Sequence, residues 1–161
     1  MSTESAPGLA ATLASAGPCA TLRLTVKSVQ TVFVGAEYEE NLSSRTMAAV
    51  ARQAGLSSAI VGFSNDRELP NALARILEMG PVLVGLSMAF QHRASEFLAL
   101  ARALRREGFE GHIVAGGHFA TAASVSLLRH NPAVDTVIRH DGEQPLALLL
   151  ERLDDRERWP Q

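Results

Sequence analysis

"IVAGGHFATAAS", residues Ile113 to Ser124, is the stretch of this sequence that says most about its fold. Small and β-branched apolar residues lead into Gly116, Gly117 and His118, and the residues after them are small and compatible with a helix. A short strand that is apolar on both faces and runs directly into a helix is typical of a parallel sheet. Two glycines with an imidazole beside them indicate a position where something approaches the backbone closely.

Four other segments resemble this strand, because each is short, apolar on both faces and followed by a turn. Between the five segments lie stretches with a helical period, and three of these stretches end just before a glycine. Strands alternating with helices predict right-handed crossovers and a parallel sheet. We therefore predict an α/β fold, flavodoxin-like or Rossmann-like, with an open five-stranded parallel sheet and helices on both faces. The expected strands are 31–36, 58–63, 81–87, 111–117 and 133–139, and the expected helices are 43–54, 68–79, 92–107, 120–130 and 143–153.

The ends of the chain differ from this alternating region. Residues 1–20 are mostly Ala, Ser, Thr, Gly and Pro with almost no charge, so we expect a flexible N-terminal tail. Residues 21–29, "TLRLTVKSV", alternate with period two and fit an antiparallel edge strand or a linker equally well. We expect one folded domain over residues 21–154, followed by a C-terminal tail or interdomain linker at 155–161.

Composition excludes several classes of function. With 15 Lys and Arg against 17 Asp and Glu, the net charge is −2, which does not favour nucleic acid or an anionic membrane as a partner. The single cysteine, Cys19, permits no disulfide within the chain and no cysteine-held iron–sulfur cluster. The sequence has no secretory signal and no apolar run long enough to span a bilayer, so we expect a cytoplasmic location.

Ligands of open α/β sheets bind beyond the carboxyl ends of the strands, which directs attention to four loops. The loop after the first strand has no G-x-G-x-x-G for a dinucleotide and no P-loop lysine. A phospho-acceptor receiver domain needs an Asp where the third strand closes, and Ser87 stands there. A hydrolase elbow would need a second glycine after "VGLS".

Three histidines follow strands three, four and five: His92, His118 and His140. The predicted fold brings them to one edge, where they could form a metal site or an acid–base group. Exposed loop histidines are common, so ordinary surface positions remain the competing interpretation. His112 and His130 lie at the opposite ends of their elements, and we expect both on the surface.

Three motifs together are similar to a known family: "PVLVGLS" at 81–87, "GGHFAT" at 116–121, and "VDTVIR" at 134–139 running into Gly142-Glu143. On these motifs, residues 29 to 153 resemble the cobalamin (vitamin B12)-binding domain. The resemblance is closest to the domain that precedes the iron–sulfur domain in B12-dependent radical SAM enzymes. It implies that the domain binds cobalamin across the carboxyl edge of the sheet.

The resemblance also implies where the cofactor lies. The nucleotide tail of cobalamin would thread between strands, and Gly116 and Gly117 would leave clearance for it. His118 would act as a second-sphere residue rather than a metal ligand. For Met88 and Phe90, ordinary core packing is an equally good explanation. Contacts to the tail or corrin are implied for Ser87, Met88, Ala89, Phe90, Gln91, Phe119, Thr121, His140, Gly142 and Glu143.

The loop after the first strand departs from the methionine synthase and mutase type of cobalamin domain. Those domains carry D-x-H-x-x-G, whose histidine coordinates cobalt, whereas this loop reads "EYEENLSS". The resemblance therefore implies a base-off and His-off cofactor, with Tyr38, Asn41 or Leu42 near the lower face of the cobalt. Weak axial ligation eases access to Co(I) and so suits methyl transfer, with the cofactor carried as methylcobalamin or hydroxocobalamin.

The sequence has no C-x-x-x-C-x-x-C for a radical SAM cluster. We therefore expect a cobalamin carrier without catalytic residues or protein metal ligands of its own, serving a radical SAM or methyltransferase partner protein or domain. A free-standing carrier and an excised domain both fit. Two alternatives from other classes are a cofactor-free interaction domain with this fold and a flavodoxin-like or metal-assisted enzyme.

Overall fold

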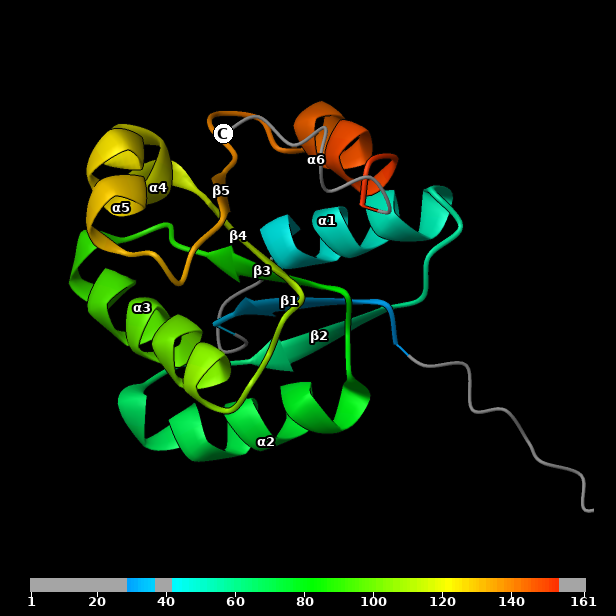
Figure 1. Ribbon diagram of the computed structural model, residues 1–161. Helices are drawn as coiled ribbons and strands as arrows, with labels where there is room; N and C mark the ends of the chain where they lie inside the picture. Colours follow the sequence, from blue (N-terminus) through cyan, green and yellow to red (C-terminus); the bar gives the residue numbers. More distant parts are fainter. Residues whose placement is uncertain (1–28, 37–41, 154–161) are drawn as a thin grey trace, which may run out of the picture.

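The computed structural model describes residues 29–36 and 42–153 of the chain. Its centre is a five-stranded sheet, entirely parallel, with strand order β2-β1-β3-β4-β5 (Figure 1). This order is the flavodoxin-like one, and the predicted fold class is confirmed. The strands are β1 (Thr31–Gly35), β2 (Ser58–Gly62), β3 (Leu83–Ser87), β4 (His112–Gly116) and β5 (Thr136–Val137).

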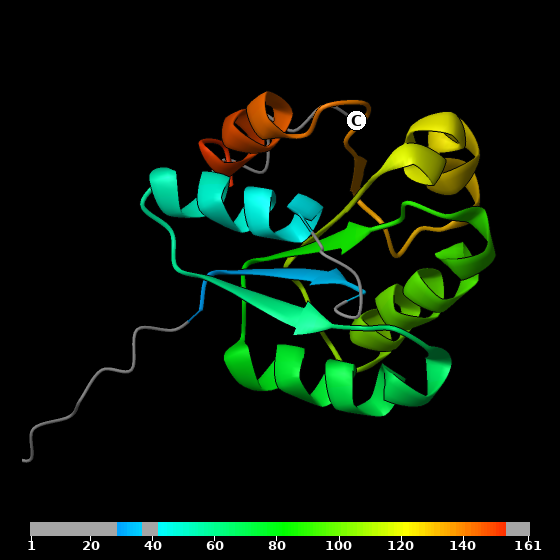
Figure 2. The same ribbon diagram turned by 180° about the vertical axis from the view of Figure 1, so that it is seen from behind.

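Helices cover both faces of the sheet, as Figures 1 and 2 show from opposite sides. One face carries α1 (Leu42–Gln53) and α6 (Glu143–Leu150). The other carries α2 (Leu69–Met79), which follows the short 3-10 turn η1 (Asp66–Glu68), together with α3 (Gln91–Arg106). The two remaining helices are α4 (His118–Ala122) and α5 (Ser124–His130). They lie beside α3 near the carboxyl ends of the strands.

Each face of the sheet has its own apolar core. The larger core lies under α2, α3, α4 and α5 and contains the ring pair Phe63 and Phe97, whose centroids are 5.3 Å apart in an edge-to-face arrangement. The smaller core lies under α1 and α6 and includes Phe33, Val114 and Leu146. Because strands covered on both sides expose neither face to water, they are apolar throughout, as the sequence pattern indicated.

The predicted boundaries hold to within a residue or two for most elements, with three differences. The helix expected at 120–130 is two helices, because it starts at His118 and breaks at Ala123. The strand expected at 133–139 is regular only over Thr136–Val137. The helix expected at 143–153 ends at Leu150, three residues early.

Several predictions fall outside the described residues. The N-terminal tail at 1–20, nearly all of the segment 21–29 and the C-terminal segment 155–161 are among them. In the described part of the chain, no helix is both long and apolar enough to cross a membrane.

His112 corrects one prediction. It was expected on the surface, yet its relative exposure is only 2%. It opens β4, a central strand covered by helices on both faces, so even the first residue of the strand is enclosed. Its Nε2 lies 2.9 Å from Thr136 Oγ1 and its Nδ1 lies 3.8 Å from Asp135 Oδ2. His130 is exposed, as predicted.

Arg105 and Asp135 join α3 to the amino-terminal end of β4 and β5, and we call this pair the Arg105–Asp135 clamp. Arg105 Nη1 donates to the carbonyls of Phe109 (2.7 Å) and Gly111 (2.8 Å), and its Nη2 donates to Asp135 Oδ2. The same carboxylate oxygen accepts the backbone N–H of Ile113 at 2.6 Å. Charge-assisted hydrogen bonds of this kind are the stronger ones in proteins.

The clamp predicts a stability effect. Asp135→Ala would leave Arg105 and the Ile113 N–H without their carboxylate, so we expect the free energy of unfolding to fall by about 1–3 kcal/mol. Urea unfolding followed by circular dichroism measures this. Asp141→Ala, in an exposed loop, should change it by no more than about 0.5 kcal/mol. An equal loss in the two variants would contradict the assignment.

Candidate functional site

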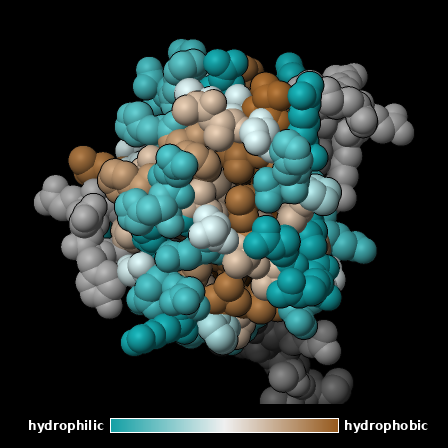
Figure 3. All heavy atoms as spheres, turned by 90° about the vertical axis from the view of Figure 1, so that its left-hand side faces the viewer, coloured by the Kyte–Doolittle hydropathy of each residue, from teal (hydrophilic) through white to brown (hydrophobic). Residues whose placement is uncertain are grey.

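A cavity of about 870 Å³ opens at the carboxyl edge of the sheet. It is lined by the start of α1, by the loops after β3 and β4, and by the segment from β5 into α6. This is the edge at which open α/β sheets bind ligands, and it includes the point between β1 and β3 where strand order reverses. Figure 3 looks onto this edge and shows an apolar strip between two hydrophilic borders.

The floor of the cavity is formed by three residues on neighbouring strands. Phe33 on β1 is in register with Gly85 on β3, which is in register with Val114 on β4. Ile138 and Leu146 line the cavity from the β5–α6 side, so this part of it is apolar. A flat, apolar group is the kind of ligand that such walls accommodate.

These floor residues were not among the site residues predicted from the sequence. Phe33 and Val114 read as ordinary strand residues, and their proximity depends on a strand order that the sequence does not state. Gly85 carried the available signal, since an isolated glycine inside an apolar strand often marks a close approach.

Hydroxyl groups border the apolar part of the cavity. The Ser87 hydroxyl, at the end of β3, lies 3.0 Å from the hydroxyl of Ser43 in the first turn of α1. Thr121 Oγ1 accepts the backbone N–H of His140 at 2.9 Å. His140 has a φ of 60°, a left-handed conformation that non-glycine residues adopt uncommonly and that is frequent at binding sites. Thr121 thus anchors the loop that borders the cavity.

Gly116 and Gly117 have different roles. A Cβ at Gly116 would meet only the Ile138 carbonyl oxygen, at 3.9 Å, so the side toward the cavity is open. At Gly117, φ is 105° and a Cβ would lie 2.7 Å from the carbonyl oxygen of Met88. The bare backbone at Gly117 is therefore required by the protein's own chain. That the two glycines leave clearance for a ligand stays a prediction. The geometry favours it at Gly116 and not at Gly117.

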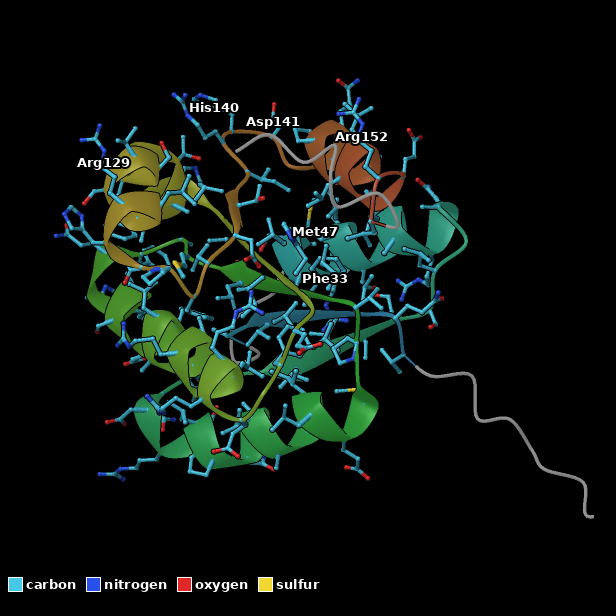
Figure 4. The ribbon with its side chains drawn as sticks, viewed as in Figure 1. Phe33, Met47, Arg129, His140, Asp141 and Arg152 are labelled. Carbon is cyan, nitrogen blue, oxygen red and sulfur yellow. The ribbon has the colours of Figure 1, made fainter. Side chains whose placement is uncertain are left out.

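Most of the site residues predicted from the sequence line this one cavity. They are Leu42, Ser87, Ala89, Phe90, Gly116, Gly117, His118, Thr121, His140, Gly142 and Glu143. Asp141 also lines it, and Figure 4 shows Asp141 and His140 on the loop that leads into α6.

Five predicted residues lie elsewhere or are not described. The side chain of Met88 is fully buried in the larger core, and Phe119 on α4 packs against that core. Gln91 is exposed at the start of α3 and does not line the cavity. Tyr38 and Asn41 lie outside the described residues.

The histidines do not converge as a metal site requires. His118 and His140 line the cavity, whereas His92 stacks on Phe90 with ring centroids 5.7 Å apart. Within residues 29–36 and 42–153, no group of three His, Cys, Asp or Glu side chains is placed to hold a metal ion. The three-histidine hypothesis therefore has no support in the part of the chain that the structure describes.

Fold and cavity together define an open flavodoxin-like α/β domain with a cavity at its carboxyl edge. Solved structures share this fold. A pilus assembly-related protein from Burkholderia pseudomallei superposes with a TM-score of 0.58 at 17% identity, covering 81% of this chain and 92% of its own. A response regulator in red light signaling of R. palustris gives a TM-score of 0.53 at 13% identity, covering 82% and 99%. At these identities the likeness concerns the fold alone.

The family described as "B12 binding domain" matches residues 31–150. This match runs from β1 to the end of α6 and covers most of the chain, so the protein belongs to the B12-binding domain family. Membership supports the expected cobalamin-binding module. No curated protein matches the chain.

The two glycines yield a prediction about stability. Gly117→Ala should lower the free energy of unfolding by about 1–3 kcal/mol, because its φ is left-handed and its Cβ would press on the Met88 carbonyl. Gly116→Ala, whose Cβ would make only an ordinary contact with the Ile138 carbonyl oxygen, should change it by no more than about 0.5 kcal/mol. Urea unfolding of the two variants compares them directly, and equal losses would show that Gly117 is not the constrained position.

Proposed function

We propose that this domain is a cobalamin carrier that holds methylcobalamin or hydroxocobalamin in the cavity at the carboxyl edge of the sheet, base-off and His-off. The family match over residues 31–150 is the observation that supports this best, because it spans every element that lines the cavity. The domain carries no catalytic residues of its own. It presents the cofactor to a radical SAM or methyltransferase partner protein or domain in the cytoplasm.

The residues of the cavity fit the chemical parts of cobalamin. The apolar walls at Phe33, Val114 and Leu146 suit the flat benzimidazole of the nucleotide tail. The hydroxyls of Ser43, Ser87 and Thr121 suit its polar edge and the sugar. Gly116 has space on its cavity side for a backbone-to-ligand approach.

The rim of the cavity suits the amide groups around the corrin. His118, His140 and Glu143 offer both hydrogen-bond donors and acceptors there, while Leu42 and Phe90 add exposed apolar surface. The role proposed for His118 is a second-sphere contact to these amides or to the tail phosphate. The domain's own task is to orient the corrin and keep the tail away from water.

The base-off and His-off state is proposed from the sequence of the loop after β1. That loop, "EYEENLSS" at 37–44, contains no imidazole to coordinate cobalt. If the tail occupies the cavity, its benzimidazole cannot coordinate cobalt at the same time. Bound in this way, cobalamin supplies a cobalt centre that can carry a methyl group.

Titration with hydroxocobalamin tests the cofactor assignment. We expect a saturable shift in the corrin absorption bands at one equivalent of the cofactor. Gly116→Leu should raise the dissociation constant by at least about tenfold, because a Cβ at this position meets only the Ile138 carbonyl oxygen, at 3.9 Å, and the larger side chain would fill cavity space. Gly116→Ala is the matched control, with an expected change of less than about threefold. If the wild-type domain leaves the spectrum unchanged, the cofactor-free interaction domain becomes the better interpretation.

Electron paramagnetic resonance of the bound Co(II) form tests the axial ligation. We expect cobalt lines without the triplet splitting that a coordinated nitrogen causes. Free cob(II)alamin at neutral pH, whose own benzimidazole coordinates cobalt, is the positive control.

The variants His118→Gln and His140→Gln extend this measurement to the histidines that line the cavity. Both should leave the Co(II) spectrum unchanged and weaken binding only modestly, since glutamine keeps a donor and an acceptor. Nitrogen splitting in the wild-type complex that disappears in either variant would identify that histidine as a ligand and overturn the proposal.

A further inference from the structure

Gly85 and Phe33 form a pair on the floor of the cavity. They are direct neighbours in register on β3 and β1, and both face the side of the sheet that α1 and α6 cover. The Phe33 ring occupies the space where a side chain at position 85 would stand. A Cβ placed on Gly85 would lie 2.5 Å from Phe33 Cδ1 and 2.8 Å from Cε1, distances that real Cβ atoms do not show.

The missing side chain at Gly85 therefore determines where the ring lies. Because Gly85 has no Cβ, the Phe33 ring lies over β3 and close to the sheet, and it lines the cavity there. A side chain at position 85 would push the ring away from the sheet, toward α1 and α6. Figure 4 shows Met47, on α1, on the same side of the sheet as Phe33, so a displaced ring would enter the space between them.

The residues around this pair restrict what can enter. Val114, Ile138 and Leu146 are each no more than 9% exposed, and none of them can neutralise a charge or satisfy a hydrogen bond with its side chain. A charged or strongly hydrated group would lose its water there without compensation. A flat aromatic group would lose little and would gain contact with the ring of Phe33.

We propose that Phe33, whose ring lies close to the sheet because Gly85 has no side chain, is a specificity-determining residue. The position of its ring sets the depth of this cavity for a flat aromatic group. It selects corrinoids that carry an aromatic base on a nucleotide tail over corrinoids that lack the tail. This inference rests on the proposed function, since it concerns the same cavity.

The test compares two ligands that differ in the tail. Cobalamin has the tail, and cobinamide has the same corrin without the nucleotide. Dissociation constants for both, measured by absorption titration, give a preference ratio for each variant. We expect the wild-type domain to prefer cobalamin. In Gly85→Ala the preference should fall by about tenfold, with cobinamide binding unchanged, because the displaced ring blocks only the tail.

A rescue variant separates this effect from general damage. In Gly85→Ala combined with Phe33→Ala, no ring remains to be displaced, so the preference for cobalamin should rise above that of Gly85→Ala and match that of Phe33→Ala alone to within about threefold. Gly111→Ala is the matched control. Its Cβ would press on the Phe109 ring and also on the Val82 carbonyl oxygen at 2.9 Å, at the amino-terminal end of the sheet and away from the cavity. It should leave the preference ratio unchanged.

Should Gly85→Ala fail to fold, Phe33→Leu supplies the test. It keeps apolar volume but removes the flat ring, and it should lower the preference for cobalamin without changing cobinamide binding. Phe109→Leu is its control.

The outcomes distinguish the two proposals. If the wild-type domain binds neither ligand, the proposed function is wrong. If it binds both but prefers neither, or if Gly85→Ala keeps the full preference, the role of Phe33 is wrong while cobalamin binding stands. A preference that is lost in Gly85→Ala and not recovered in the double variant also overturns the role of Phe33.

Discussion

The close approach of two backbone segments, Met88 and Gly116–Gly117, is the constraint on which the site depends. Met88 N–H donates to the Gly116 carbonyl at 2.7 Å, which extends the pairing of β3 and β4 beyond their last regular residues. The Met88 carbonyl then accepts the Ala120 N–H at 3.4 Å and lies where a Cβ of Gly117 would be. Two central loops of the cavity are thereby fixed to one another, and α4 starts directly at the edge. Any side chain at Gly117 would separate them.

The Arg105–Asp135 clamp lies at the end of the sheet opposite to the cavity. The Arg105–Asp135 clamp and the buried His112 lie where β4 and β5 begin, and the clamp fixes α3 to the sheet. At the carboxyl end of β4 the backbone is bare at Gly116 and Gly117, and Gly85 leaves it bare in the middle of β3. Asp135 belongs to the "VDTVIR" motif that supported the family resemblance, so one part of that motif serves the fold rather than the ligand.

Much of the fold could be predicted from the sequence, because strands covered on both faces are apolar throughout and the helices between them end at glycines. The errors have local causes. His112 is polar and opens its strand, which suggested the surface, but its burial depends on helices remote in sequence. The break at Ala123 has no glycine or proline to mark it. For the site, residues in loops were predictable from their position after strands. The pair Phe33 and Gly85 was not, because it exists only once β1 and β3 are neighbours.

The same fold supports unlike sites, so the chemistry of the edge decides what it can do. A receiver site needs an Asp at the end of the third strand, where this chain has Ser87, and the acidic residues Asp141 and Glu143 follow β5 instead. In place of the carboxylate, this edge has residues without side chains. A glycine lies inside β3, with an aromatic ring where its side chain would stand, and an open glycine ends β4. Apolar walls with a bare backbone suit a large flat ligand, which they would hold by area and shape, with the reactivity left to the ligand itself.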